Sequence, residues 1–195
     1  GTSSGNGNGQ LNGGEIIEIS AQVSNIGAVS VSNVYAILSS SNSSVSVLND
    51  SVYFGTVETS AGPSSAGTFS IQLSGNVREE ENLALRVTIF DNSGDEWETD
   101  LELRAAASDI EFGSVSIVDN NDGLINPGET VSLNVALKNT GSATAANVSG
   151  VLTTNSAILE ILDNQGAWGS MAPSNNNISN TDNFSVSANN SVIPG

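Results

Sequence analysis

The chain repeats itself, and this internal repeat constrains the fold more than any other feature of the sequence. Residues 8–15 align with residues 122–129, and an offset of 114 residues carries Gly9 onto Gly123. Without a gap, the same offset superimposes further glycine, asparagine and apolar positions: Asn25 on Asn139, Gly27 on Gly141, Asn33 on Asn147, Leu38 on Leu152, Phe54 on Trp168 and Gly55 on Gly169. A one-residue shift then places residues 68–71 opposite residues 183–186. We therefore expect two copies of one structural unit.

Each repeat shows the alternation of apolar and polar residues that marks half-buried β-strands. Two equivalent segments show it over four apolar residues each: Ile17, Ile19, Ala21 and Val23 in the first repeat, and Val131, Leu133, Val135 and Leu137 in the second. Further strands are expected at residues 34–39, 44–48, 67–73, 83–90 and 97–103. No segment shows the 3.6-residue period of a helix. The sequence predicts an all-β fold of two tandem β-sandwich repeats, residues 1–107 and 108–195.

The strands at residues 83–90 and 97–103 are expected to form a hairpin, because residues 91–94 supply turn chemistry between them. Trp97 lies on the return strand and is expected to be buried. Two pairs of large aromatic residues occupy equivalent repeat positions, Phe54 with Trp168 and Phe69 with Phe184. This equivalence favours a common role in the core over ligand binding.

The two repeats are incomplete in opposite ways. The second opens with a strand, residues 110–118, that has no counterpart in the first. The first ends with the hairpin of residues 83–103, which has no counterpart in the second. A sandwich that lacks strands exposes unpaired edges, which are templates for another chain. Either the chain is a segment of a longer tandem array, or neighbouring subunits complete the sandwiches by strand addition through residues 110–118 and 184–193.

Composition excludes several classes of function. The chain has no cysteine and no histidine, so disulfide frameworks, Cys/His zinc sites and Ser-His-Asp triads are absent. It carries 4 Lys+Arg against 21 Asp+Glu, a formal charge of −17, which argues against nucleic acid and anionic membranes as partners. No run of apolar residues approaches the length of a membrane span, so membrane insertion is not expected. Heavy use of Ser, Asn, Thr and Gly fits an extracellular protein, which would then be a mature form.

One loop of the second repeat is a candidate calcium site. Calcium prefers oxygen ligands from carboxylates, amides and backbone carbonyls. Residues 119–129 bring several such side chains into one short turn, and the expected ligands are Asp119, Asn121, Asp122, Asn126 and Glu129. The spacing matches an EF-hand loop only in part, because its first position would be Val118 and Glu129 leads into a strand. The alternative is an Asx-rich turn whose side chains satisfy the local backbone.

Residues 119–131, followed by residues 137–141, resemble the Ig-like (CARDB-like) β-sandwich repeats of secreted and cell-surface bacterial proteins. Those repeats carry an Asp/Asn-rich turn, a Pro-Gly-Glu triplet, a strand and an Asn-x-Gly corner, in that order. The triplet is residues 127–129 here and the corner is residues 139–141. The first repeat departs from the pattern with Gly13 in place of the proline. Such repeats serve as stalks, adhesive modules, structural repeats and accessory domains on secreted hydrolases, so the resemblance implies two tandem Ig-like β-sandwich repeats and leaves the function open.

Together these features predict an extracellular structural protein that is not an enzyme. It would be a subunit of a surface filament or stalk and would assemble head-to-tail with copies of itself. The alternative is an adhesin or a carbohydrate-binding accessory module of a larger secreted protein, with glycans as partners. A third interpretation is a passive spacer beside a secreted peptidase. Paired carboxylates are the machinery of glycoside hydrolysis, but nothing in the sequence places such a pair in a cleft.

Overall fold

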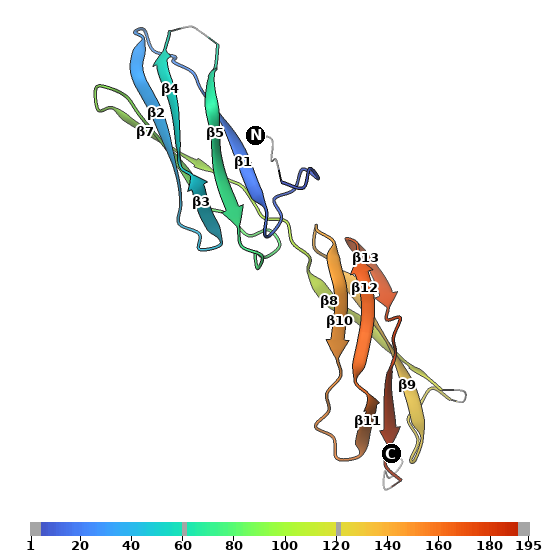
Figure 1. Cartoon of the computed structure of the whole chain (residues 1–195). Coiled ribbons are helices and arrows are strands. Elements are labelled where there is room, and N and C mark those ends of the chain that lie inside the picture. Colours follow the sequence, from blue (N-terminus) through green and yellow to red (C-terminus); the bar gives the residue numbers. More distant parts are fainter. Residues whose placement is uncertain (1–4, 60–61, 120–121, 191–195) are drawn as a thin grey trace. The chain divides into compact units, whose positions relative to one another are not determined.

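The structure, a computed structural model, describes residues 5–59, 62–119 and 122–190. The regular elements in this part of the chain are all β-strands (Figure 1), which confirms the predicted all-β fold. These residues include no helix that is long and apolar enough to cross a membrane. The chain divides into two compact units, Gly1–Ala107 and Ser108–Gly195.

The first unit is a sandwich of two antiparallel sheets. Its strands are β1 (Ile16–Val23), β2 (Val31–Ser40), β3 (Val45–Asn49), β4 (Ser51–Val57), β5 (Ser64–Leu73), β6 (Leu85–Phe90) and β7 (Glu96–Leu101). One sheet has the order β1-β5-β3, and the other has the order β4-β2-β6-β7. Among the described strands, β1 pairs only with β5 and β7 only with β6. Each of these two strands therefore has one edge without a partner strand in the described part of the chain.

Alternate residues of both sheets point into one apolar core. Ile17 of β1 and Phe69 of β5 meet Leu38 of β2 and Leu85 of β6 there, and all four side chains are buried. Burial of one such side chain contributes roughly 1.5–3 kcal/mol to stability. The alternation in residues 16–23 thus reflects a strand with one face in the core and one face in solvent.

The second unit repeats this plan with different strands at its edges. Its strands are β8 (Ile110–Val118), β9 (Thr130–Asn139), β10 (Ala145–Val151), β11 (Leu159–Asp163), β12 (Gln165–Met171), β13 (Ser174–Ser179) and β14 (Phe184–Ala188). β9 pairs with β8 along its length, and with β13 and β14 over successive halves of its other edge. β10 pairs with β12 alone among the described strands, whereas its counterpart β2 pairs with both β4 and β6. In the predicted assembly segment 184–193, β14 pairs with β9 and β11 and offers no free edge, and residues 191–193 lie outside the described part of the chain.

The aromatic residues at equivalent repeat positions lie in or against the two cores. Phe54 and Phe69 belong to the core of the first unit, and Trp168 and Phe184 to that of the second. The Trp168 and Phe184 ring centroids are 6.1 Å apart. The indole N–H of Trp168 donates to the backbone carbonyl of Val135 at 2.9 Å, which satisfies its one polar atom inside the core.

The same special backbone conformations recur in both units. Asn33 and Asn147, the residues related by the offset, both have φ 54°, in the left-handed region that asparagine tolerates better than most residues. Each sits at a break in strand register, after which Val34 pairs with Gly55 and Val148 with Gly169. Such bulges increase the local twist of a strand pair, here of β2 with β4 and of β10 with β12.

An asparagine corner closes the same end of each unit. In the second unit the Asn139 amide donates to the carbonyls of Ala143 and Met171, both at 2.8 Å, and its Oδ1 accepts from Gly141 at 3.2 Å and from Asp109 at 3.1 Å.

In the first unit Asn25 makes the matching bonds. Its side-chain amide donates to the carbonyls of Val29 at 2.8 Å and Val57 at 3.1 Å, and its Oδ1 accepts from the Gly27 amide at 2.9 Å. The two corners differ in the bond from Asp109, the residue that precedes β8. Asn139 is fully buried, whereas Asn25 is only partly buried.

Trp97 contradicts the expectation that it is buried. Its side chain is 48% exposed. The residue lies opposite Ile89 on the inward side of the hairpin, but β7 is the outermost strand of its sheet. The facing sheet ends at β1 among the described strands, so no described strand covers Trp97 from across the sandwich.

The asparagine corners predict unequal costs for the same substitution. Asn139→Ala leaves four backbone groups at a buried site without their partners, so we expect the free energy of unfolding to fall by about 3 kcal/mol. Asn25→Ala removes three bonds at a partly exposed site, where water replaces some of them, and we expect about half that loss. Urea unfolding of each variant would measure both values. Equal losses at the two positions would contradict this account of the corners.

Candidate functional site

The two aspartates of the predicted calcium loop accept hydrogen bonds from nearby backbone amides. Both carboxylate oxygens of Asp119 lie 3.1 Å from the Gly123 nitrogen. Asp122 Oδ1 accepts from the Leu124 amide at 3.0 Å, two residues onward, as in an Asx-turn. Gly123 itself has φ 74°, which allows the sharp bend. Asn121, one of the predicted ligands, lies outside the described residues.

Glu129 closes the loop through the backbone. Its Oε2 accepts from the Asn126 amide at 2.9 Å, and the Asn126 side-chain amide lies 3.4 Å from both oxygens of Asp122. In the first unit Glu15 does the same, since its Oε2 accepts from the Asn12 amide at 3.2 Å. The first loop has no aspartate, so this glutamate holds the turn without one.

The structure thus connects Asp122, Asn126 and Glu129 by successive hydrogen bonds and places Asp119 at the Gly123 amide. Within residues 5–59, 62–119 and 122–190, no group of three or more Asp or Glu side chains is placed to hold a metal ion. The bonds to backbone amides are those of the alternative interpretation, an Asx-rich turn. Calcium at this loop stays a prediction.

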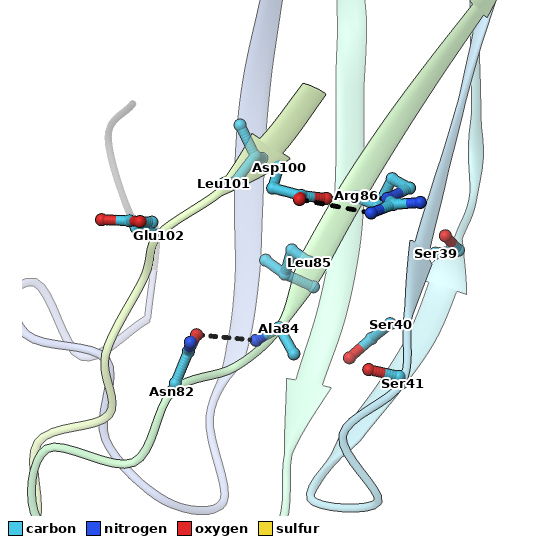
Figure 2. Close-up of a pocket in the computed structure, with 10 residues that line it drawn as sticks. All are labelled: Ser39, Ser40, Ser41, Asn82, Ala84, Leu85, Arg86, Asp100, Leu101 and Glu102. Carbon is cyan, nitrogen blue, oxygen red and sulfur yellow. Dashed lines mark hydrogen bonds and ion pairs between the residues drawn. The ribbon is translucent and has the colours of Figure 1, made fainter. Parts of the chain in front are cut away.

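A polar pocket of about 560 Å³ lies at one end of the hairpin in the first unit. Figure 2 shows Arg86 of β6 beside Asp100 of β7, with three consecutive serines, residues 39–41, on the neighbouring segment. The Arg86 guanidinium makes a bidentate pair with Asp100 at 2.7 and 3.2 Å and also contacts Glu98 at 3.3 Å. Two carboxylates offset its charge, so the pocket is not an anion site.

Hydrogen bonds to the backbone shape the rim of this polar pocket. The Ser40 hydroxyl donates to the Leu83 carbonyl at 2.8 Å, and the Asn82 side chain accepts from the Ala84 amide at 3.0 Å. Ala84 has φ 45°, an uncommon conformation for alanine. Sequence reasoning did not single out Arg86. The predicted hairpin could have indicated this ion pair, because its register places Arg86 directly opposite Asp100.

A second, apolar groove of about 840 Å³ runs between the unpaired edges of β1 and β7. One wall is the inward face of β1, and the other is the inward face of the β6–β7 hairpin. The apolar lining comes from both sheets and the residues that flank them: Leu11, Ile17, Ile19, Ala21, Val23, Ala36, Phe54, Phe69, Val87, Ile89, Leu101 and Leu103. The rest of the lining is Gly7, Gly9, Glu18, Ser20, Gln22, Thr99, Asp100 and Glu102. We call this site the edge groove.

Comparison with known proteins does not assign the chain to a family. No protein family matches the chain, and no curated protein matches it. Among solved structures, the secreted serine protease VesC from Vibrio cholerae matches over 94% of this chain and 45% of its own, with 9% sequence identity and a TM-score of 0.34. The chain therefore spans less than half the length of that protein.

This match corrects one expectation. The sequence predicted a protein that is not an enzyme, and the matching structure is that of a protease, so that prediction is withdrawn. The likeness is too weak to support any argument for a protease activity in this chain.

The Arg86 pair predicts a pH effect with a definite sign. The hydrogen bond from Arg86 lowers the pKa of Asp100 below its ordinary value of 3.8. The stabilisation from this pair is therefore present above pH 3.8 and is lost as the pH falls through the lowered pKa. In Arg86→Ala we expect the pKa of Asp100 to rise towards 3.8, as measured by carboxyl NMR during a pH titration. Arg104→Ala, which removes a separate ion pair with Glu80, should leave it unchanged. An unchanged value in Arg86→Ala would contradict the assignment.

Proposed function

We propose that the protein is an extracellular structural protein, a subunit of a surface filament or stalk whose β-sandwich units join head-to-tail by strand addition. The observation that carries this proposal is the complementary state of the sheet edges. Among the described residues, no strand pairs with the edge of β1 beside the edge groove, whereas β8 pairs with the equivalent edge of β9 in the second unit. The resemblance of residues 119–131 to repeats of secreted and cell-surface proteins supports the location.

Exposed apolar residues on β8 support the same proposal. Phe112 and Val115 are 65% and 54% exposed. Their partners on β9 are Leu137 and Val135, which pack against the core, so this side of β8 faces the interior of the sandwich. No described strand covers them, because β10 pairs with β12 alone. Exposed apolar patches of this kind mark interaction surfaces.

Charge sets the conditions for assembly. At −17 the subunits repel one another, and the repulsion extends over a Debye length of about 30 Å at 0.01 M salt but only about 8 Å at 0.15 M. Ionic strength therefore favours association. The proposal includes calcium as a second means of neutralisation, bound at the loop of Asp119, Asp122, Asn126 and Glu129.

The assembly is testable by sedimentation velocity and negative-stain microscopy of the purified protein. We expect fibres or large oligomers at 0.15 M salt and fewer at 0.01 M salt, because screening removes the repulsion. Loosening of the fibres by EDTA would support calcium in the assembly, and fibres indifferent to EDTA would remove calcium from it. Monodisperse monomers at every salt and calcium concentration would contradict the proposed assembly.

A row of aromatic side chains favours a second candidate, a glycan-binding or adhesive module. Tyr53, Tyr35 and Phe90 are direct cross-strand neighbours on the outer face of the sheet of β4, β2 and β6. The Tyr35 and Phe90 rings stack at 5.1 Å, and Tyr53 is 61% exposed. The Tyr53 hydroxyl donates to Asn33 Oδ1 at 2.9 Å, which places an amide beside the ring. Aromatic rings with neighbouring polar groups suit the apolar faces and hydroxyls of sugars.

Glycan binding is testable on an array of oligosaccharides. We expect Tyr53→Ala to reduce any retention at least tenfold, because Tyr53 is the most exposed ring of the row. Trp97→Ala is the matched control, since it removes an exposed aromatic residue from the opposite face of the same sheet. No retention of the unmodified protein, or equal losses in both variants, would rule out this row as the binding surface.

A further inference from the structure

We infer that the edge groove is an acceptor site for one extended peptide strand that runs antiparallel to β1 and has the chemistry of residues 109–118. The inference rests on the proposed assembly by strand addition and names its acceptor and the kind of segment that fits. Three independent features of the two units carry it: the pairing of β9, the asparagine corner, and the lining of the groove.

The second unit shows how this kind of edge is used. β9 is the repeat counterpart of β1, and β14 pairs with it as β5 pairs with β1. On its other edge β9 carries β8, antiparallel, from Ile110 opposite Asn139 to Val118 opposite Ser132. The corresponding edge of β1 has no partner strand among the described residues. Half of the main-chain N–H and C=O groups of an edge strand point outward, so this edge can bind a further strand.

The asparagine corner shows what the missing strand contributes. Asn139 Oδ1 accepts one amide from Gly141 and a second from Asp109, just before β8. Thr140 completes the contact, because its amide donates to the Asp109 carbonyl at 2.8 Å.

In the first unit, Asn25 Oδ1 accepts one hydrogen bond at this corner, from the Gly27 amide. Ile26, the counterpart of Thr140, is 100% exposed. A strand with an amide and a carbonyl at the position of Asp109 would make both of these contacts.

The lining of the edge groove sets the side chains that the strand needs. On β8 the residues that face inward are Phe112, Val115 and Ile117, opposite Leu137, Val135 and Leu133 of β9. The β1 counterparts of these β9 residues are Val23, Ala21 and Ile19, which all line the groove. The hairpin supplies the facing wall through Val87, Ile89 and Leu101. A strand of this chemistry would find apolar surface on both sides, whereas β8 in its own unit leaves Phe112 and Val115 exposed.

One position of the strand calls for glycine. Gly113 sits at a bulge between Phe112 and Ser114, and a Cβ there would lie 2.9 Å from the Ala136 carbonyl. The β1 counterpart of Ala136 is Gln22, whose backbone carbonyl occupies the same place in the strand. The acceptor therefore selects an extended segment with three inward apolar residues and a glycine at the bulge.

The test uses the full chain and a labelled synthetic peptide of residues 108–118, followed by fluorescence anisotropy. We expect saturable binding. A peptide with Phe112→Asp and Ile117→Asp should bind at least tenfold more weakly, because both charges would enter the apolar groove. A peptide with Gly113→Val should also bind at least tenfold more weakly, because its side chain would clash with a backbone carbonyl of the acceptor strand at the bulge. No binding of the parent peptide up to about 1 mM would overturn the inference.

The tryptophans report where the peptide binds. Trp97 is half exposed and lies directly opposite Ile89, which lines the edge groove, whereas Trp168 is buried in the second unit. Binding at the groove should shift the emission of Trp97 to shorter wavelength, and Trp97→Phe should abolish that shift. Binding without any shift would mean that the peptide binds away from the edge groove, which would also overturn the inference. Asn25→Ala should weaken binding several-fold, and because this variant loses stability, it is first checked for cooperative unfolding.

Sedimentation of the same samples separates this inference from the proposed assembly. If the chain stays monomeric but binds the peptide with the Trp97 shift, the acceptor site stands and the proposed self-assembly fails. If the chain assembles but the peptide neither binds nor dissociates the assemblies, the assembly stands and the edge groove is not its acceptor. If the peptide binds and dissociates the assemblies, a second copy of this chain supplies the strand.

Discussion

Because the described residues form strands and no helices, their main-chain N–H and C=O groups depend on neighbouring strands for partners. The chain has no cysteine to add a disulfide, and the ion pairs of Arg86 and Arg104 involve exposed side chains. Such exposed pairs contribute little to stability. Each unit therefore depends on strand pairing and on the apolar core that pairing encloses. A strand edge without a partner lacks hydrogen bonds to a neighbouring strand and leaves part of the apolar core uncovered.

The asparagine corners show how side chains fix the end of a strand where pairing stops. One side-chain amide bridges a carbonyl in the loop after β9 and the carbonyl of the last residue of β12 in the second unit, and the same positions after β1 and in β4 in the first. The asparagine ends or follows a strand of one sheet (β9 or β1) and bonds a strand of the other sheet (β12 or β4), so the corner ties the two layers of the sandwich together. Its buried form in the second unit includes the chain just before β8. Asn139 bonds this flanking segment and is buried, whereas Asn25 bonds Gly27, Val29 and Val57 and is only partly buried.

Much of the fold could be predicted from the sequence. The alternation at residues 16–23 and 131–137 identified strands with one buried face, and the hairpin of β6 and β7 followed from the turn at residues 91–94. β4 was not predicted, because Ser51–Val57 follows β3 with a single residue between them and its glycine interrupts the apolar pattern. Its pairing with β2 through a bulge at Asn33 is a tertiary feature that a period-two pattern does not encode.

The candidate sites were harder to predict. The loop of Asp119 and Glu129 was visible as a cluster of oxygen ligands, but sequence spacing does not say whether these oxygens face a common point or their own backbone amides. Trp97 was misjudged because burial depends on the strand across the sandwich, not on the alternation of its own strand. Likewise the edge groove is formed by two strands that are about 80 residues apart in sequence, and neither strand is unusual by itself.

The inequality of the two units gives the proposed assembly a direction. If both units carried the same open edge, two copies would pair through identical surfaces, and a two-fold contact of that kind closes after one dimer. Here the acceptor edge belongs to the first unit, and the strand that fits it has the chemistry of a segment in the second. A contact between unlike surfaces propagates from copy to copy unless rotation closes a ring, and β8 would have to leave β9 in order to pair with β1 of the next copy. Repetition of the fold supplies the matching geometry, and the difference between the repeats supplies the polarity that a filament needs.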